Sequence, residues 1–241
     1  MVFLHGLFGS WQNLGTAVRT AADHYQVHAL DLRNHGKSPH HERHDYAALA
    51  ADVAHYIDQN IAQSCYVLGH SMGGKTAMQL ALTRPELVDK LIVVDIAPRA
   101  YPPHHDEILH GLNQIQGQTF AGRRDADQAL SQWVPELAVR SFLLKNLLLN
   151  EGTATWRMNL NTLSEQYPHI ADWPASDNTY CGPVMFLKGA NSDYIEAQDK
   201  DPVLSLFPAA QVKTIASTGH WPHAEKATVF NKLMLDFLAA Q

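Results

Sequence analysis

Cysteine is scarce in this 241-residue sequence. The two cysteines, Cys65 and Cys181, are too few for a disulfide framework and do not form a CxxC pair. We therefore expect both to be buried thiols in a reduced, cytoplasmic setting. A chain of this length buries a large core without disulfides, so their scarcity does not argue against a stable globular fold.

Basic clusters and long apolar runs are missing as well. The formal net charge is -6, from 18 basic and 24 acidic residues, and the longest basic cluster is Arg123-Arg124. We expect no nucleic-acid partner, because DNA and RNA are bound through clustered Lys and Arg. No apolar run approaches the roughly 18 residues of a membrane span, and the N-terminus lacks the basic segment of a signal peptide. We therefore expect no membrane partner.

Short apolar runs alternate with helical patterns along most of the chain. The runs cover residues 2–4, 27–30, 65–68, 91–96, 184–187 and 212–215. This alternation is typical of the α/β class, in which a mostly parallel sheet is flanked by helices. Helical spacing appears at residues 46–57, behind Asp45 as a plausible N-cap, and again behind Pro222 near the C-terminus.

Residues 98–182 break this alternation. They contain helical stripes such as 137–149 but no comparable strand run. We expect an all-helical cap inserted into a single domain that spans residues 1–241, with a core formed by residues 1–97 and 183–241. Bulky cap residues such as Phe142 and Trp156 are candidates for an acyl pocket or for the core of the cap itself.

The strongest chemical signal is Gly69-His70-Ser71-Met72-Gly73, which lies between a predicted strand and a helix that ends near Thr83. Small residues two positions before and after Ser71 allow a tight strand-to-helix turn. Such a turn presents the serine hydroxyl at the carboxyl edge of the sheet. The N–H of Met72, at the N-terminus of the helix, can then donate to an oxyanion on the attacked carbonyl.

Two other segments supply the remaining parts of a serine-hydrolase site. His5-Gly6-Leu7-Phe8-Gly9 follows the first strand directly, and its Leu7 N–H can be aimed at the same oxyanion. His220 follows the last strand run, in Thr218-Gly219-His220-Trp221-Pro222. Serine needs a base within hydrogen-bond reach to accept its proton, and His220 is the candidate for that role.

Six segments together resemble one known family. They are HGLFGS, DLRNHGKS, GHSMGGK, VVDIAP, GANSD and GHWPHAEK, in this order. Over essentially its whole length the chain resembles the α/β-hydrolases, and specifically the YbfF-type esterases. The resemblance implies Ser71 as nucleophile, His220 as general base, and Leu7 and Met72 as oxyanion-hole residues. It implies small-molecule carboxylic esters as substrates, with acyl-CoA thioesters as further candidates, and no cofactor or metal.

One departure from the family concerns the start of the sheet. Members usually carry two additional strands before the HG loop, whereas this sequence begins four residues ahead of His5. We therefore expect a sheet without the usual first strands. The oligomeric state is left open between a monomer and a homodimer.

The acid that orients His220 has two candidates. Asp193, in Gly189-Ala190-Asn191-Ser192-Asp193, stands where most α/β-hydrolases keep their acid. Asp95 ends the preceding strand and also points toward the carboxyl edge of the sheet. In the YbfF-type subgroup, the aspartate of the DIAP segment is the one expected to serve. We therefore favour Asp95, with Asp193 as the alternative acid.

Several rival functions use the same residues. Residues 69–76 also match the P-loop pattern GxxxxGK[ST], but nucleotide binding leaves the HG loop and the His220 segment unexplained. On the hydrolase hypothesis, Lys75 is expected at the helix surface or in its first turn. Lyase, carbon–carbon hydrolase and haloperoxidase chemistry share Ser, His and Asp, and a non-catalytic scaffold is a further alternative.

The 15 histidines also raise the question of a metal site. The candidate sets are His40, His41 and His44, and His104, His105 and His110. Neither set matches the HExxH spacing that turns two imidazoles to one face of a helix. Solvated loops are the expected setting for both sets. His70, beside the candidate nucleophile, is expected to pack rather than to react.

Overall fold

The computed structural model describes residues 1–240, whose main sheet has six parallel strands in the order β2-β1-β3-β4-β7-β8. The strands are β1 (Val2–Leu4), β2 (His28–Leu30), β3 (Cys65–His70), β4 (Val88–Val94), β7 (Val184–Gly189) and β8 (Ala210–Ile215). All six predicted strand runs are strands of this sheet, which confirms the α/β class.

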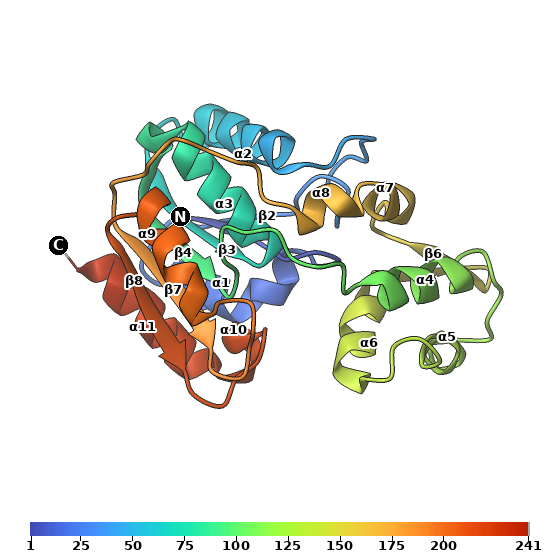
Figure 1. Cartoon of the computed structure of the whole chain (residues 1–241). Helices are drawn as coiled ribbons and strands as arrows, with labels where there is room; N and C mark the ends of the chain where they lie inside the picture. Colours follow the sequence, from blue (N-terminus) through green and yellow to red (C-terminus); the bar gives the residue numbers. More distant parts are fainter. Residues whose placement is uncertain (241) are drawn as a thin grey trace.

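Helices cover both faces of the sheet (Figure 1). They are α1 (Gly15–Ala22), α2 (Tyr46–Asn60), α3 (Met72–Thr83), α9 (Lys200–Leu206), α10 (Pro222–Glu225) and α11 (Ala227–Ala239), with single 3-10 turns at Trp11–Leu14, Pro85–Leu87 and Ala197–Asp199. Successive residues of a strand point to opposite faces. Val2 and Val67 therefore pack with α2 and α3, whereas Phe3 and Leu68 pack with α1 and α11.

Helix ends follow local sequence signals. The predicted N-cap of α2 is confirmed, because the Asp45 carboxylate accepts the Ala48 N–H at 2.9 Å. The predicted C-terminal helix is divided into α10 and α11, since Lys226 leaves the helical region with φ -136° and ψ 59°. Cys65 is buried as expected, but the prediction for Cys181 is wrong because its side chain is exposed.

The order of the strands brings two loops together. The chain runs from β1 outward to β2 and then returns to β3 on the other side of β1. Leu4 at the end of β1 pairs with Gly69 near the end of β3. The HG loop and the loop at Ser71 therefore leave neighbouring strands at the same edge, the position where open α/β sheets form their binding crevice.

The cap lies between β4 and β7 and forms the lobe on the right of Figure 1. It contains α4 (Asp106–Ile115), α5 (Arg123–Leu130), α6 (Leu137–Leu143), a 3-10 turn (Leu144–Asn146), β5 (Leu147–Asn150), β6 (Thr153–Trp156), α7 (Leu160–Glu165) and α8 (Tyr167–Ala171). The prediction of an all-helical cap is wrong, because β5 and β6 form an antiparallel hairpin. Glu151 and Gly152 have φ values of 51° and 83°, which suit a two-residue hairpin turn.

None of the helices within residues 1–240 is both long enough and apolar enough to cross a bilayer.

Two buried histidines fasten the HG loop to the segment after β2. The Nε2 atom of His5 accepts the N–H of Leu32 at 3.0 Å, and that of His35 accepts the N–H of Phe8 at 3.1 Å. Each Nδ1 donates to a backbone carbonyl, that of Gly6 or Arg33. Both rings must stay neutral, because a protonated Nε2 accepts no hydrogen bond. Burial lowers the pKa of His5 to about 4 and that of His35 to about 3.

We predict that the free energy of unfolding falls as the pH drops from 6.5 to 4. In the unfolded chain these imidazoles have pKa values near 6.5 and bind protons over this range, whereas in the folded chain they stay neutral. Each such proton lowers the free energy of unfolding by about 1.4 kcal/mol per pH unit. Urea titrations at several pH values test this. His35→Gln is expected to reduce the slope, whereas His24→Gln, on the exposed surface, is its control. Equal slopes in the His35 variant and the wild type would contradict the prediction.

Candidate active site

Ser71 lies on a sharp turn between β3 and α3. Its backbone has φ 53° and ψ -119°, a conformation that is strained for a residue with a side chain. Close backbone packing surrounds it. A Cβ on Gly69 would lie 2.1 Å from the carbonyl oxygen of Gly73, and a Cβ on Gly73 would lie 2.4 Å from that of Leu4. Glycine is therefore required at both positions, which explains the spacing of the motif.

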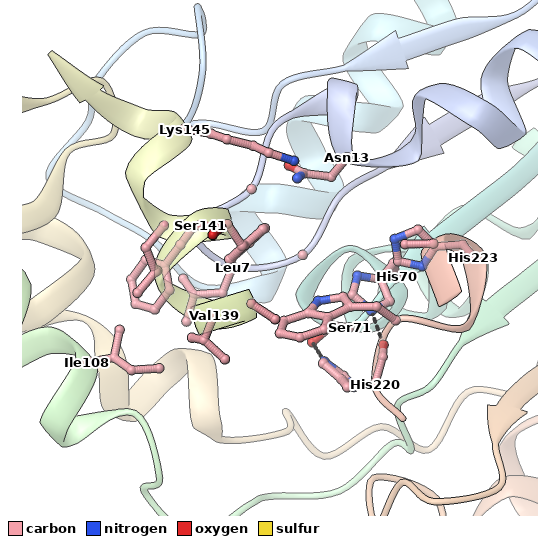
Figure 2. A pocket seen from close by; sticks show the side chains of 18 of the residues that line it. Leu7, Asn13, His70, Ser71, Ile108, Val139, Ser141, Lys145, His220 and His223 are labelled. Atoms are coloured by element: carbon pink, nitrogen blue, oxygen red, sulfur yellow. Dashed lines mark hydrogen bonds between the residues drawn. The ribbon is translucent and has the colours of Figure 1, made fainter. Parts of the chain in front are cut away.

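Ser71, His220 and Asp95 form a chain of hydrogen bonds. The Oγ atom of Ser71 lies 3.0 Å from Nε2 of His220, and these two side chains point toward each other in Figure 2. The Nδ1 atom of His220 lies 2.8 Å from Oδ2 of Asp95. The three residues come from the ends of β3, β8 and β4, so the fold brings them together from 125 and 149 positions apart in the sequence.

The carboxylate of Asp95 is fully buried and well supplied with donors. Besides His220, it accepts the N–H of Gly189 at 2.9 Å and the hydroxyl of Ser192 at 2.5 Å. Three donors thus satisfy the hydrogen-bonding needs of this buried carboxylate. Asp193 is exposed, and its backbone carbonyl accepts a hydrogen bond from the guanidinium of Arg99 at 3.3 Å. The GANSD segment thus contributes Ser192, a residue that the sequence analysis did not assign.

Aromatic rings hold His220 from two sides. Tyr194 stacks on its imidazole, with ring centroids 3.9 Å apart and planes at 21°. His70 packs against the rings of His220 and His223, and its Nε2 donates to the carbonyl oxygen of His220 at 2.8 Å. Burial is the main cause that keeps the pKa of His70 well below its usual range. His70 is therefore a neutral support beneath the candidate base.

Leu7 and Met72 stand beside the hydroxyl of Ser71. Met72 is the first residue of α3, where an N–H has no carbonyl partner within the helix. Leu7 belongs to the loop that follows β1 directly. Both residues line the small cavity next to Ser71.

Two cavities border Ser71, a larger one of about 400 Å³ and a smaller one of about 40 Å³. Ile108, Val139 and Phe142 reach into the larger cavity from the cap (Figure 2 labels the first two). Trp156 does not line either cavity. It is buried in the cap, where its indole N–H donates to the carbonyl of Leu112 at 3.1 Å.

No three His, Cys, Asp or Glu side chains within residues 1–240 are grouped so that they would hold a metal ion. His44 is buried rather than solvated, contrary to the expectation for its set. It packs near His35 and contacts the side-chain amide of Asn34 at 3.2 Å.

Lys75 lies in the first turn of α3, one of its two predicted positions, but it is not at the helix surface, because only 1% of its surface is accessible. The segment that returns from the cap covers α3 at this point. The ammonium of Lys75 donates to the carbonyls of Ala171 and Asp172 at 3.1 and 2.7 Å, and it lies 5.3 Å from the ring centre of Tyr46. Lys75 therefore ties the helix behind Ser71 to the end of the cap.

A family model described as the alpha/beta hydrolase fold matches residues 1–227. The chain belongs to the α/β-hydrolase family. Among curated relatives, the sn-1-specific diacylglycerol lipase ABHD11 of Xenopus laevis is 41% identical over 247 residues, which cover 99% of this chain and 79% of the relative. Esterase YbfF of Escherichia coli (strain K12) is 39% identical over 230 residues, covering 94% of this chain and 87% of that protein.

Solved structures agree with the sequence relatives. A marine microorganism esterase superposes on this α/β-hydrolase with a TM-score of 0.94 at 35% identity, covering 98% of this chain and 94% of the other. The resemblance to YbfF-type esterases is thereby confirmed, and the chain is an ester-hydrolysing enzyme.

We predict that Lys75 makes stability rise with pH above neutrality. Burial lowers the pKa of Lys75 to about 7, so the unfolded chain binds a proton that the folded chain lacks up to the ordinary lysine value near 10.5. Between pH 7 and 9, the free energy of unfolding of the wild type is expected to rise relative to that of Lys75→Met, by up to about 1.4 kcal/mol per pH unit. Urea unfolding measures both, and Lys200→Met, at an exposed site, is the control. Parallel pH profiles for the wild type and Lys75→Met would contradict this.

Proposed function

We propose that this enzyme hydrolyses carboxylic esters through an acyl-enzyme on Ser71. In this proposal His220 is the general base, Asp95 is the acid that orients it, and the N–H groups of Leu7 and Met72 form the oxyanion hole. The observation that carries the proposal is the continuous hydrogen-bond chain from Asp95 through His220 to Ser71, with distances of 2.8 and 3.0 Å.

The proposed reaction has two halves. Ser71 Oγ attacks the ester carbonyl while its proton passes to Nε2 of His220, and the developing oxyanion accepts the two backbone N–H groups. His220 then returns the proton to the departing alcohol. In the second half, water loses a proton to His220 and attacks the acyl group. The bond from the acyl carbon to Ser71 Oγ then breaks, Oγ takes the proton from His220, and the carboxylic acid leaves. Nδ1–H of His220 stays bonded to Asp95 throughout, which stabilises the imidazolium.

We infer that the larger cavity takes an apolar part of the substrate. Its cap wall carries aliphatic and aromatic side chains such as Ile108, Val139 and Phe142. Substrates of this kind include acyl-CoA thioesters, because a thioester carbonyl would meet the same nucleophile and donors. They also include glycerolipid esters of the type named for the Xenopus laevis relative. A chain-length series of esters and thioesters distinguishes these substrates.

The cap is proposed to be an insertion within one domain. It leaves the sheet after β4 and returns at β7, and these strands are neighbours that pair from Leu91 with Val184 to Val94 with Leu187. The cap therefore interrupts the chain without interrupting the sheet.

Ser71→Ala is expected to remain folded and to lose ester hydrolysis by a factor of about 10^4 to 10^6, because no other hydroxyl is proposed to form the acyl-enzyme. Turnover of p-nitrophenyl esters gives the rate, and thermal unfolding reports on the fold. Ser205→Ala, on the exposed surface of α9, controls for the loss of a serine hydroxyl. Substantial turnover by folded Ser71→Ala would disprove the acyl-enzyme.

The two candidate acids are separated by isosteric substitutions. Asp95→Asn is expected to lower kcat by about 10^3 to 10^4, since an amide in place of the carboxylate no longer sets the tautomer of His220. Asp193→Asn is expected to stay within a few-fold of the wild type, because its side chain is exposed. Both kcat values are measured on variants checked for folding by circular dichroism. A large loss in Asp193→Asn alone would reverse the assignment.

A further inference from the structure

His105 lies where the two cavities beside Ser71 meet. The larger and the smaller cavity share only Leu7, Ser71 and His105 among the residues that line them. His105 stands immediately before α4, at the start of the cap, and its ring meets that of Phe8 edge-on at 6.0 Å. A substrate with its scissile bond at Ser71 and its two ends in the two cavities would therefore pass beside this imidazole.

The hydrogen bonds of Tyr167 determine which nitrogen of His105 carries the proton. The hydroxyl oxygen of Tyr167 accepts the backbone N–H groups of His104 and His105, each at 3.3 Å. It also lies 2.8 Å from Nδ1 of His105. Since both lone pairs of the oxygen are occupied, its own proton is free to donate to Nδ1. Nδ1 is then an acceptor, and the neutral ring carries its proton on Nε2.

The Nε2–H group of His105 is left without a partner in the protein. Within residues 1–240, the imidazole of His105 forms a hydrogen bond with Tyr167, through Nδ1, and with no other residue. Its Nε2 atom is not one of the fully buried side-chain atoms that lack a partner, so Nε2 is accessible. Burial, with the neighbouring His104 and His220, lowers the pKa of His105 to about 3. A neutral donor thus belongs to a residue that lines both cavities, and the cap wall of the larger one is mostly apolar.

We propose that Nε2–H of His105 donates a hydrogen bond to a second oxygen of the substrate, close to the scissile ester, and so selects oxygenated esters over their hydrocarbon counterparts. Tyr167 is the positioning residue that holds the required tautomer. The proposal rests on the proposed function, because it places the scissile bond at Ser71. A methylene against this donor leaves it unsatisfied, whereas an ether, hydroxyl or carbonyl oxygen accepts its proton.

Two pairs of isosteric esters test the proposal and locate the oxygen. On the acyl side, p-nitrophenyl methoxyacetate is compared with p-nitrophenyl butanoate. On the alcohol side, 2-methoxyethyl butanoate is compared with butyl butanoate in a pH-stat. Each pair differs by one oxygen in place of one methylene. The ratio of kcat/KM within a pair is compared between wild type and variants, so that differences in intrinsic reactivity cancel.

In at least one pair, His105→Leu is expected to lower the ratio in favour of the oxygenated ester by about 5- to 15-fold, the effect of one hydrogen bond. Tyr167→Phe is expected to shift the same ratio in the same direction, although it leaves the imidazole in place. Tyr180→Phe removes a buried hydroxyl that donates to Val88, outside both cavities, and should leave the ratio unchanged. General damage to the fold would lower kcat/KM for both esters of a pair by the same factor and leave their ratio unchanged.

Ratios within twofold of the wild type in both pairs, for folded His105→Leu, would overturn the inference while leaving ester hydrolysis intact. If His105→Leu does not fold, unchanged ratios in Tyr167→Phe overturn it equally. Absence of turnover of all four esters by the wild type would overturn the proposed function and this inference together. The pair that responds identifies whether the acyl or the alcohol part carries the oxygen.

Discussion

The close approach of α3 to the end of β1 is the constraint on which the rest of the site depends. Gly73 lies so near the carbonyl oxygen of Leu4 that a Cβ there would be 2.4 Å away. This contact sets the start of α3 beside the HG loop and imposes a positive φ on Ser71. Such backbone strain costs about 1–3 kcal/mol and persists only when surrounding packing enforces it. Sheet pairing between Leu4 and Gly69 provides that packing.

Buried polar groups around this contact follow two different rules. Asp95 is surrounded by donors, and its carboxylate contacts His220, Gly189 and Ser192. His5 and His35 instead accept backbone N–H groups on one nitrogen, which requires neutral rings. The same low-polarity interior thus surrounds the Asp95 carboxylate with donors and excludes charge from the histidines that support the HG loop.

The cap is fastened to the core by polar contacts placed close to Ser71. Lys75, one turn into the helix behind the elbow, binds the carbonyls at the end of α8. Tyr167, at the start of α8, contacts His105 at the start of the cap. The two ends of the insertion are therefore joined to each other and to the elbow. The contacts that hold the cap therefore also shape the cavities beside Ser71.

The sequence by itself determined the α/β class, the strand runs and the positions of Ser71 and His220, since strand, turn and helix signals act over a few residues. The tertiary structure alone decided between Asp95 and Asp193 as the partner of His220, because that choice depends on distances between the ends of separate strands. It also decided that Lys75 is buried, since the covering segment lies about a hundred positions away. Local patterns carry no information about which distant chain segment will exclude water from a side chain.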